Sequence, residues 1–491
     1  MQACFEKHRQ YITIICYSAP KKPSYARFEV CTLRQLDRGE YNGYIVPLLQ
    51  GATGVSIHHN KGPRIISTLI KVCSFFSLVG DFMLRNRTLL AVSLAVCAAF
   101  TGIGMVIPVR VLYAQSRGAS LVIIGAMASS YLISNFLFQY PSGWLADHWG
   151  RKPMMILSLA VQAMLSAVYL VINDPVLFIV LRFAEGAAAA AFLPSARALI
   201  NDTIPPKQQG EAFGIFSAFL NAGFLLGPGL GGLLAATGYA TAFIGAVIFR
   251  LVAIVIVVTM IHVKVRGKQE VDEAARPVSL RTLFKIGLTG AYILAFGNFI
   301  FVGFDISLTA LWLHDNLGAS IAVIGFAYVA FSIPGIIVAP FGGRVADRRR
   351  RSTLILIFGL AQVPIYIIYG LSNTILIIFI FFIIHGVVYS MMEPAVDAHV
   401  AASTIAGARA RIQGLYSAAG LLGGFVGASG CSILYGLNFR LPLFTIGVVF
   451  GICVLIGGIL IRISESRNNA LLSFDQGIEK PKIIAATSEI K

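Results

Sequence analysis

The sequence predicts an all-α membrane protein whose twelve transmembrane helices form two six-helix bundles related by pseudo-two-fold symmetry. Three observations predict this class. Of the 491 residues, 57% are hydrophobic and only 12% are charged, whereas soluble domains carry about 25% charged residues. The hydrophobic residues come in runs of about 20, the length of a helix that crosses a bilayer. A pattern of residues in the first half also recurs in the second half.

The chain begins with a polar, basic stretch, up to about residue 63, that sustains neither helical nor strand periodicity. We therefore expect residues 1–82 to be a poorly ordered cytoplasmic extension. Within it, residues 65–78 are apolar but too few to span and include Lys71, which favours an interfacial helix. Alternatively, the natural chain starts at Met83, directly before two arginines and an apolar run.

Twelve apolar runs follow this extension. They predict spans at 88–113, 120–144, 154–173, 175–199, 211–236, 240–262, 285–313, 320–343, 353–371, 374–400, 411–436 and 440–462. We expect an N-terminal bundle over 83–262, a basic cytoplasmic linker over 263–284, a C-terminal bundle over 285–462 and a cytoplasmic tail over 463–491.

The charges indicate topology. Lys and Arg outnumber Asp and Glu by 39 to 22, a net charge of +17, and they gather in the loops after even-numbered spans. By the positive-inside rule both termini are then cytoplasmic. A nucleic-acid-binding protein would instead gather them on one basic face with interleaved aromatic residues, so we expect no such partner. The seven cysteines include no CxxC pair, and neither a metal site nor a cofactor is expected.

An internal repeat links the two predicted bundles. Gly118-Ala119-Ser120 recurs 200 residues later as Gly318-Ala319-Ser320. Further pairs at the same spacing are Gly125 and Gly325, Gly143 and Gly343, Asp147 and Asp347, Pro194 and Pro394, Gly223 and Gly423, and Gly227 and Gly427. A single register without gaps indicates duplicated bundles, which in transporters rock against each other around a midplane site.

The loop after the second span carries the first motif. Gly143, Asp147, Gly150, Arg151 and Lys152 match every fixed position of G-x-x-x-D-x-x-G-R-K/R, so the loop resembles the signature loop of the major facilitator superfamily. The glycines are expected to allow a tight turn, and the Asp147 carboxylate to meet Arg151 or the positive end of a neighbouring helix.

The resemblance implies a conformational role for this loop. The neighbouring helix would be the start of span eleven, near Gln413, and the contact would help to hold the outward-facing state. The second copy keeps Asp347 but has Arg350 in place of the second glycine. The alternative is a charged loop that only enforces topology.

Span four carries Arg182-Phe183-Ala184-Glu185-Gly186, which resembles the R-x-x-x-G motif of the superfamily. Arg182 and Glu185 share a helix face about one turn apart and lie about 10 to 15 Å into the membrane. Ionisable groups at that depth mark ion or proton pathways by default. The alternative is a structural ion pair that joins span four to its neighbours.

Span five resembles the motif of the drug:proton antiporter branch, G-x-x-x-G-P-x-x-G-G. Its fixed residues are Gly223, Gly227, Pro228, Gly231 and Gly232. Glycines at this spacing let helices approach closely, and a proline kinks the helix. The second half has Ala428 in place of the proline. The alternative is an ordinary packing helix.

Further polar residues are candidates for the transport cavity. They are His385, Tyr389 and Glu393 on one face of span ten, Asn298 and Asp305 in span seven, and Arg110 in span one. The resemblance implies that spans one, four, seven and ten line the cavity, so that His385 and its repeat-mate Glu185 would face the cavity from opposite bundles. A histidine there is a proton carrier or a packing residue. Arg250, in the middle of span six, has no evident partner.

The resemblance covers about residues 88–462 and is strongest to multidrug and tetracycline-type exporters. It implies proton-coupled efflux of a small amphipathic compound or drug by alternating access across the cell membrane, by a monomer. Arg110 interrupts the usual Pro-x-x-P-x-Tyr pattern and favours an anionic or zwitterionic substrate. Uptake or facilitated transport of a metabolite such as a sugar or organic acid is the alternative, as is a transport-inactive receptor or membrane enzyme. No P-loop, HExxH or GxSxG motif supports ATP-driven pumping or hydrolysis.

Overall fold

The computed structural model describes residues 11–18, 27–34, 86–205, 208–261, 283–404 and 409–475. They belong to two compact units, Met1–Asn86 and Arg87–Lys491.

The first unit contains a β-hairpin where the sequence predicts irregular chain. Strands β1 (Tyr11–Ser18) and β2 (Arg27–Arg34) pair antiparallel, with Tyr11 opposite Arg34 and Ser18 opposite Arg27. The expectation of an extension without regular structure is therefore wrong for these segments. The backbone N–H and C=O groups of each strand form hydrogen bonds with the other strand. Such pairing does not require an alternating hydrophobic pattern in either segment, so the sequence did not reveal it. The interfacial helix predicted at 65–78 lies outside the described residues.

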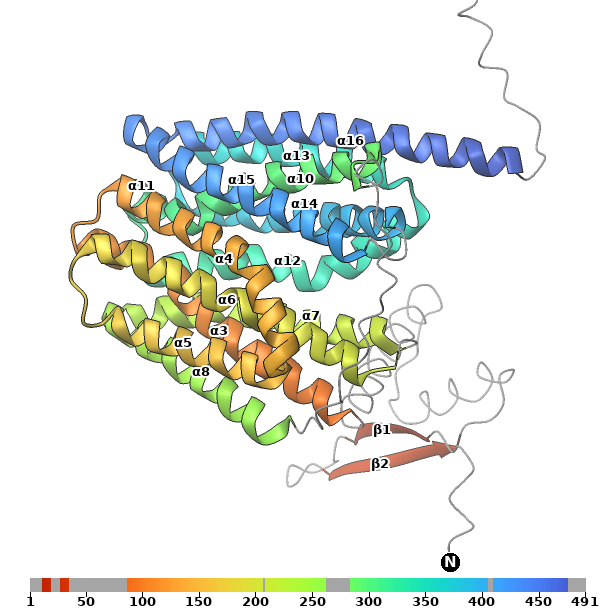
Figure 1. Ribbon diagram of the computed structural model, residues 1–491, viewed down its shortest axis with the longest axis horizontal. Coiled ribbons are helices and arrows are strands. Elements are labelled where there is room, and N and C mark those ends of the chain that lie inside the picture. The colour runs from red at the N-terminus through yellow and green to blue at the C-terminus, as the bar shows by residue number, and fades with distance from the viewer. Residues whose placement is uncertain are drawn as a thin grey trace, which may run out of the picture. The chain divides into compact units, whose positions relative to one another are not determined.

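The described residues of the second unit form helices and no strands (Figure 1), and a helix lies at each of the twelve predicted spans. They are α3 (Arg87–Ser116), α4 (Leu121–Trp149), α5 (Arg151–Val168), α6 (Pro175–Thr203), α7 (Gln209–Ala235), α8 (Tyr239–Met260), α10 (Ile286–Phe304) with η2 (Asp305–Thr309) and α11 (Ala310–Leu317), α12 (Ile321–Arg348), α13 (Arg351–Leu371), α14 (Ile375–Ser403), α15 (Arg409–Leu437) and α16 (Leu441–Asp475). The predicted fold class is confirmed for this unit.

Eleven of the described helical segments are long and apolar enough to cross a membrane, α10 to α11 counting as one. The remaining helix, α5, has 18 residues and begins with Arg151 and Lys152. It nevertheless packs against α6 and α8 as a full member of the bundle. The last helix runs past the predicted end of its span to Asp475. In this extension Glu465 accepts a hydrogen bond of 2.6 Å from the Ser352 hydroxyl at the start of α13.

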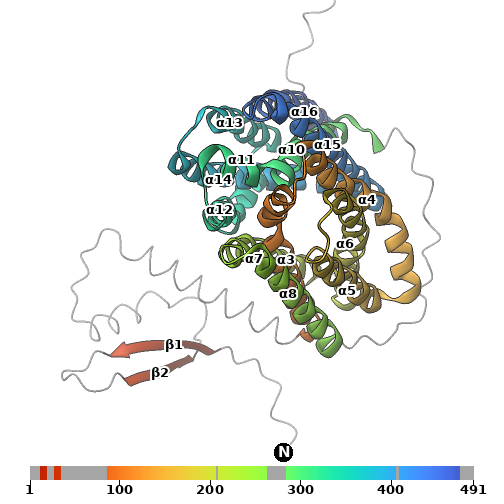
Figure 2. The same cartoon turned by 90° about the vertical axis from the view of Figure 1, so that its left-hand side faces the viewer.

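The helices of the two bundles pack in the same pattern (Figure 2). In the N-terminal bundle α3 contacts α7 and α8, α4 contacts α6, and α5 contacts α6 and α8. In the C-terminal bundle α10 contacts α15 and α16, α12 contacts α14, and α13 contacts α14 and α16. Each of these contacts in one bundle thus has its counterpart in the other, as the sequence repeat predicts.

A turn shared by the two bundles shows the repeat at the level of single residues. Gly118 and Gly318 both have positive φ, 84° and 64°, a conformation that glycine adopts without steric cost. Ser120 and Ser320 then cap the next helix, because each side chain accepts a hydrogen bond from the backbone N–H of the third residue of that helix, Ile123 or Val323. The recurring Gly-Ala-Ser is therefore one turn used twice.

The π-helix η2 interrupts the repeat by one residue. A Cβ on Gly227 would lie 2.7 Å from the carbonyl oxygen of Thr101, and a Cβ on Gly427 would lie 2.2 Å from the carbonyl oxygen of Ile300. The two glycines are 200 residues apart, whereas the two residues that they contact, Thr101 and Ile300, are 199 residues apart. Beyond η2 the spacing is 200 again, as Gly118 and Gly318 show. A π-turn holds one residue more than an α-turn, which accounts for the shift.

The two bundles meet through α4 with α15 and through α7 with α12. The Ser129 and Ser429 hydroxyl oxygens lie 2.6 Å apart and share a hydrogen bond. A Cβ on Gly325 would lie 2.4 Å from the carbonyl oxygen of Pro228. We call the end with the loops after α4, α6, α12 and α14 the basic end. The contacts named here all lie towards the opposite end, where α4 and α12 begin.

At the basic end the signature loop and α15 do not form the expected contact among the described residues. Asp147 pairs with Arg151 of its own loop, and Gln413 is exposed. A Cβ on Gly414 would meet no atom within 4 Å. The bundles are therefore joined at the opposite end, while this site at the basic end is open.

Candidate functional site

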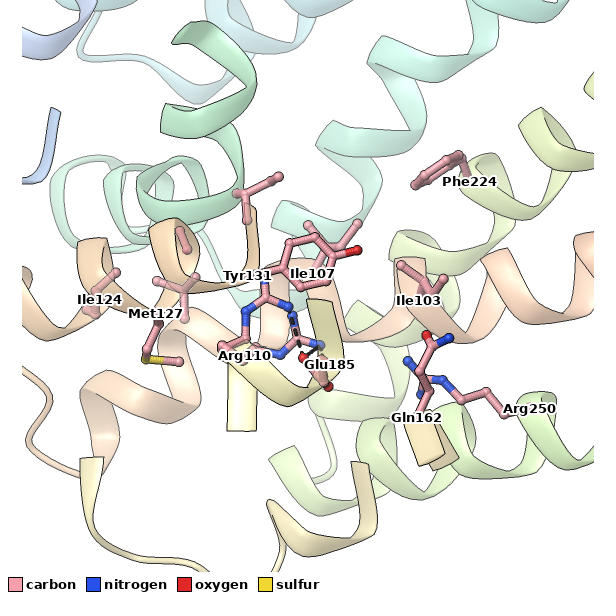
Figure 3. A pocket seen from close by; sticks show the side chains of 14 residues that line it. Ile103, Ile107, Arg110, Ile124, Met127, Tyr131, Gln162, Glu185, Phe224 and Arg250 are labelled. Carbon is pink, nitrogen blue, oxygen red and sulfur yellow. Dashed lines mark hydrogen bonds and ion pairs between the residues drawn. The ribbon is translucent and has the colours of Figure 1, made fainter. Parts of the chain in front are cut away.

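A cavity lies within the N-terminal bundle (Figure 3). Ile306 of η2, in the C-terminal bundle, is also one of its lining residues. Most of its wall is apolar, and its polar residues carry guanidinium, carboxylate, amide and phenol groups. Its lining residues are Ile103, Ile107, Arg110, Val111, Ile124, Met127, Ala128, Tyr131, Gln162, Arg182, Glu185, Phe224, Arg250 and Ile306. An apolar wall with a few converging polar groups is the usual form of a small-molecule site.

Glu185 is the centre of an ion-pair network in this cavity. Its Oε2 lies 2.9 Å from Arg182 Nη1 and 3.3 Å from Arg110 Nη2. All three residues are buried, with 3%, 5% and 7% of their surface exposed. The sequence predicts the pair within span four, but not that Arg110 from span one completes it (Figure 3).

Aromatic rings and close helix packing hold the network in position. The Arg182 guanidinium lies 4.1 Å from the centre of the Tyr131 ring, and that of Arg110 lies 5.6 Å from the Tyr169 ring, as in cation–π contacts. A Cβ on Gly186 would lie 2.3 Å from the Tyr131 carbonyl oxygen. Only glycine therefore lets α6 approach α4 closely enough for these contacts.

Arg250 belongs to the same cavity. Its Nη1 donates a hydrogen bond of 2.8 Å to the Ser166 hydroxyl on α5, and its side chain lines the cavity beside Gln162 (Figure 3). Only 2% of its surface is exposed. This partner is not predictable from the sequence, because Ser166 is 84 residues away and serine is common in membrane helices.

His385 lies in the C-terminal bundle, away from Glu185. Its Nδ1 is 3.2 Å from the Tyr369 hydroxyl, and its Nε2 is 3.2 Å from Gln362 Oε1 and 3.4 Å from the Tyr366 hydroxyl. The Phe301 and Phe331 rings pack on it. The expectation that His385 faces Glu185 across a common cavity is wrong, because its hydrogen bonds are made within its own bundle.

The other candidates of spans seven and ten form a second group. The Tyr389 hydroxyl interacts with Asn298 and with Glu393, so three predicted residues are brought together. Asp305 begins η2 and is partly buried, and its carbonyl accepts a hydrogen bond of 3.2 Å from the Tyr328 hydroxyl. None of the four lines the cavity that contains Glu185.

Comparison with known proteins gives the family. A family model described as Major Facilitator Superfamily matches residues 92–311 and 291–488. The chain belongs to the Major Facilitator Superfamily. It is therefore a multi-span membrane transporter of small molecules rather than an enzyme.

Curated relatives of this superfamily protein span most of its length. The quinolone resistance protein NorA of Staphylococcus aureus (strain COL) is 24% identical over 390 residues, covering 79% of this chain and 98% of the relative. Multidrug resistance protein 2 of Bacillus subtilis (strain 168) is 24% identical over 399 residues, with the same coverage.

Solved structures of similar fold are also superfamily transporters. A bacterial homologue of the human lysosomal transporter Spinster, inward-facing and occupied, superposes with a TM-score of 0.64 at 16% identity over 77% of this chain and 97% of that one. The nucleoside transporter NupG gives 0.62 at 15% identity, over 77% and 98%. These likenesses show the fold.

The superfamily signature loop is built around one glycine. Gly150 has φ 96° between α4 and α5, whereas Gly143 lies inside α4 with no atom within 4 Å of an added Cβ. The expectation that both glycines make the turn is therefore wrong for Gly143, because α4 continues to Trp149. Arg151 bridges Asp147 and Asp202 of α6.

Lys152 of the same loop ties α5 to α8. Its ammonium donates to the carbonyl oxygens of Val258 and Ile261 at 2.9 and 2.7 Å, where a cation is favoured by the end of a helix. In the second copy, the side chain of Asp347 lies outside the described part of the chain.

The span-five motif packs α7 against two helices. On one face Gly223, Gly227 and Gly231 meet α3, and a Cβ on Gly231 would lie 2.1 Å from the Met105 carbonyl oxygen. On another face Gly232 meets α12 of the other bundle, where a Cβ on Gly232 would lie 2.7 Å from the Ile321 carbonyl oxygen. Pro228 lies inside α7 between these faces. The motif thus lies where α3, α7 and α12 meet.

Proposed function

We propose that this transporter exports a small amphipathic compound in exchange for protons, by alternating access across the cell membrane. The observation that carries the proposal is the buried Arg110–Glu185–Arg182 network in a cavity with apolar walls. The names of the relatives, a quinolone resistance protein and a multidrug resistance protein, support the substrate class.

Glu185 is the group that we propose exchanges the proton. Protonation would remove the one negative charge that compensates Arg110 and Arg182, and leave two buried guanidinium groups that repel each other. The network would then rearrange, and the difference in burial cost would shift the balance between the two cavity states. A substrate that binds best with ionised Glu185 competes with the proton, as exchange requires.

The orientation of the chain belongs to the same proposal. Basic loops favour the cytoplasm, so we place the basic end and both termini there. The contacts between the bundles at the opposite end then close the outer side, in the state that receives substrate from the cytoplasm. Because one chain contains both bundles and the whole cavity, we propose that the monomer is the functional unit.

The test is proton movement in inverted membrane vesicles that contain the wild-type protein, Glu185→Gln or the control Glu211→Gln. Glu211 is exposed in the first turn of α7. We expect a lipophilic drug to make the lumen more alkaline with wild type and Glu211→Gln, but not with Glu185→Gln. Wild-type rates of coupled transport in Glu185→Gln would contradict the role of Glu185.

Proton-coupled carriage of an organic acid is the second candidate, favoured by the three arginines of the cavity. A bound anion beside Glu185 would favour its protonation, so acid and proton would bind together and move in the same direction. In the same vesicles an organic acid would then make the lumen more acidic. The direction of the pH change distinguishes the two candidates.

A further inference from the structure

The cavity carries more positive than negative charge. Among the described residues that line it, Glu185 is the single carboxylate, whereas Arg110, Arg182 and Arg250 supply three guanidinium groups. Charges are costly to bury in a membrane protein unless they are compensated. Within the described part of the chain, two positive charges of this cavity therefore lack a compensating carboxylate.

The fold does not require these arginines, because the C-terminal bundle packs the equivalent helices together without them. We call the place where these helices meet the helix junction. Gln162 and Tyr169 recur as Gln362 and Tyr369. The residues 200 positions after the three arginines are Ala310, Phe382 and Phe450. Phe382 packs its ring 5.2 Å from the Tyr369 ring, and Phe450 packs 5.8 Å from the Tyr366 ring. An apolar filling of this junction is thus available to the fold.

Two of the arginines also keep donors unused. The buried Nε atoms of Arg110 and Arg250 have no hydrogen-bond partner in the described structure. Arg182, by contrast, is engaged by Glu185 and covered by the Tyr131 ring. A buried donor without a partner costs about 1–3 kcal/mol. We therefore expect these two Nε–H groups to donate hydrogen bonds to an acceptor atom of a bound ligand.

We infer that the cavity binds the carboxylate of an amphipathic substrate between Arg110 and Arg250. The guanidinium groups supply charge and free donors, and Ile103, Ile107 and Phe224 supply an apolar wall for the rest of the molecule (Figure 3). A zwitterion also fits, because its cationic end would compete with the proton for Glu185. The inference rests on the proposed function only in taking this cavity as the substrate site.

The experiment is a calorimetric binding measurement on the purified full-length chain with three probes of equal size. They are naphthylacetate, naphthylethanol and naphthylethylammonium. We expect the carboxylate to bind about tenfold or more tightly than the alcohol, the usual gain from a hydrogen bond to a charged group. This comparison uses wild-type protein and needs no variant. Equal affinity of the acid and the alcohol would overturn the inference.

Three variants locate the binding group. Arg250→Gln is expected to abolish the preference for the carboxylate, so that the ratio of the acid's affinity to the alcohol's affinity falls to about one. Arg250→Lys, which keeps the charge, retains most of the preference. Arg349→Gln, at an exposed position of the basic end, retains all of it. A preference that survives Arg250→Gln would assign the anion to another site, and displacement of naphthylacetate by millimolar chloride would indicate a site for small inorganic anions. Either result would overturn the inference.

Because binding is measured without a pH gradient, its outcome is separate from that of the vesicle experiment. A carboxylate preference together with uncoupled transport would keep the anion site and remove proton exchange. Coupled transport without a carboxylate preference would keep proton exchange and remove the anion site.

Discussion

At the scale of single residues, the signature loop contains one glycine whose backbone conformation requires glycine, Gly150, and one whose conformation does not, Gly143. Gly150 adopts φ 96°, while Gly143 is helical and has open space at its Cβ position. Both occupy fixed positions of the same motif. The structure therefore predicts different costs for the same change at the two positions.

We predict that Gly150→Ala lowers the free energy of unfolding by about 1–3 kcal/mol, because φ 96° with ψ 156° is a backbone conformation open almost only to glycine. Gly143→Ala should have no such cost and, because alanine favours helix, should be neutral or slightly stabilising. Thermal unfolding of the two purified variants in detergent checks this. Equal destabilisation would mean that Gly143 has a packing role in another conformation.

Some side-chain partners in the candidate site were predictable and others were not. Arg182 and Glu185 are one helical turn apart, so their pairing follows from spacing. Arg110 and Arg250 reach the cavity from other helices, and the face that each helix turns inwards depends on packing. The recurrence of Gln162 as Gln362 and of Tyr169 as Tyr369 was a usable signal for the junction around Glu185.

At the scale of helices, close approach depends on glycines whose neighbours are backbone atoms. Those of α7 meet α3 on one face and α12 on another. Backbone cannot move aside as a side-chain end can, so an added methyl group must separate the helices. This distinguishes them from glycines in similar helices that face open space.

We predict that Gly231→Ala lowers the free energy of unfolding by about 1–3 kcal/mol, the cost of overpacking. The variant should therefore give less folded protein and unfold at a lower temperature. The added Cβ would lie 2.1 Å from the carbonyl oxygen of Met105. Gly430→Ala is the matched control, because no atom lies within 4 Å of a Cβ at that position on α15. Gel filtration and thermal unfolding measure both effects, and a Gly231→Ala variant as stable as the control would contradict this packing.

Helix positions were predictable because the bilayer imposes a length on each apolar run. The π-helix η2 was not, since a single inserted residue changes hydrogen bonding without changing hydrophobicity. The repeat spacing of 200 residues begins at Gly118 in the sequence and continues to Gly427. The shift to 199 before η2 becomes visible only when the contacts of α3 and α10 are compared.

At the scale of the whole molecule, residues related by the repeat also meet across the two bundles. The Gln115 amide donates a hydrogen bond of 2.7 Å to the Asp315 carboxylate, 200 residues later. Arg197 and Asp397, another pair at this spacing, attract each other electrostatically. Equivalent residues can meet in this way only near a two-fold axis, so these pairs lie close to the axis about which the bundles would rock.

Alternating access predicts that holding the opposite end closed stops transport. Ser129 and Ser429, whose hydroxyl oxygens lie 2.6 Å apart, are close enough for a disulfide after replacement by cysteine. In a background without other reactive cysteines, we expect oxidation of Ser129→Cys/Ser429→Cys to abolish transport and reduction to restore it. Each single variant serves as a control, since it has no partner thiol.

A second cysteine pair tests the other half of the cycle. Asp147 and Gln413 make no contact in this conformation, so Asp147→Cys/Gln413→Cys should not cross-link while the first pair is closed. If the proposed rocking brings the signature loop to α15 when the opposite end opens, this pair should cross-link under those conditions. The yields of the two disulfides are therefore expected to change in opposite directions. Simultaneous high yield of both would show that the bundles do not rock as rigid bodies, because a rigid bundle cannot close both ends.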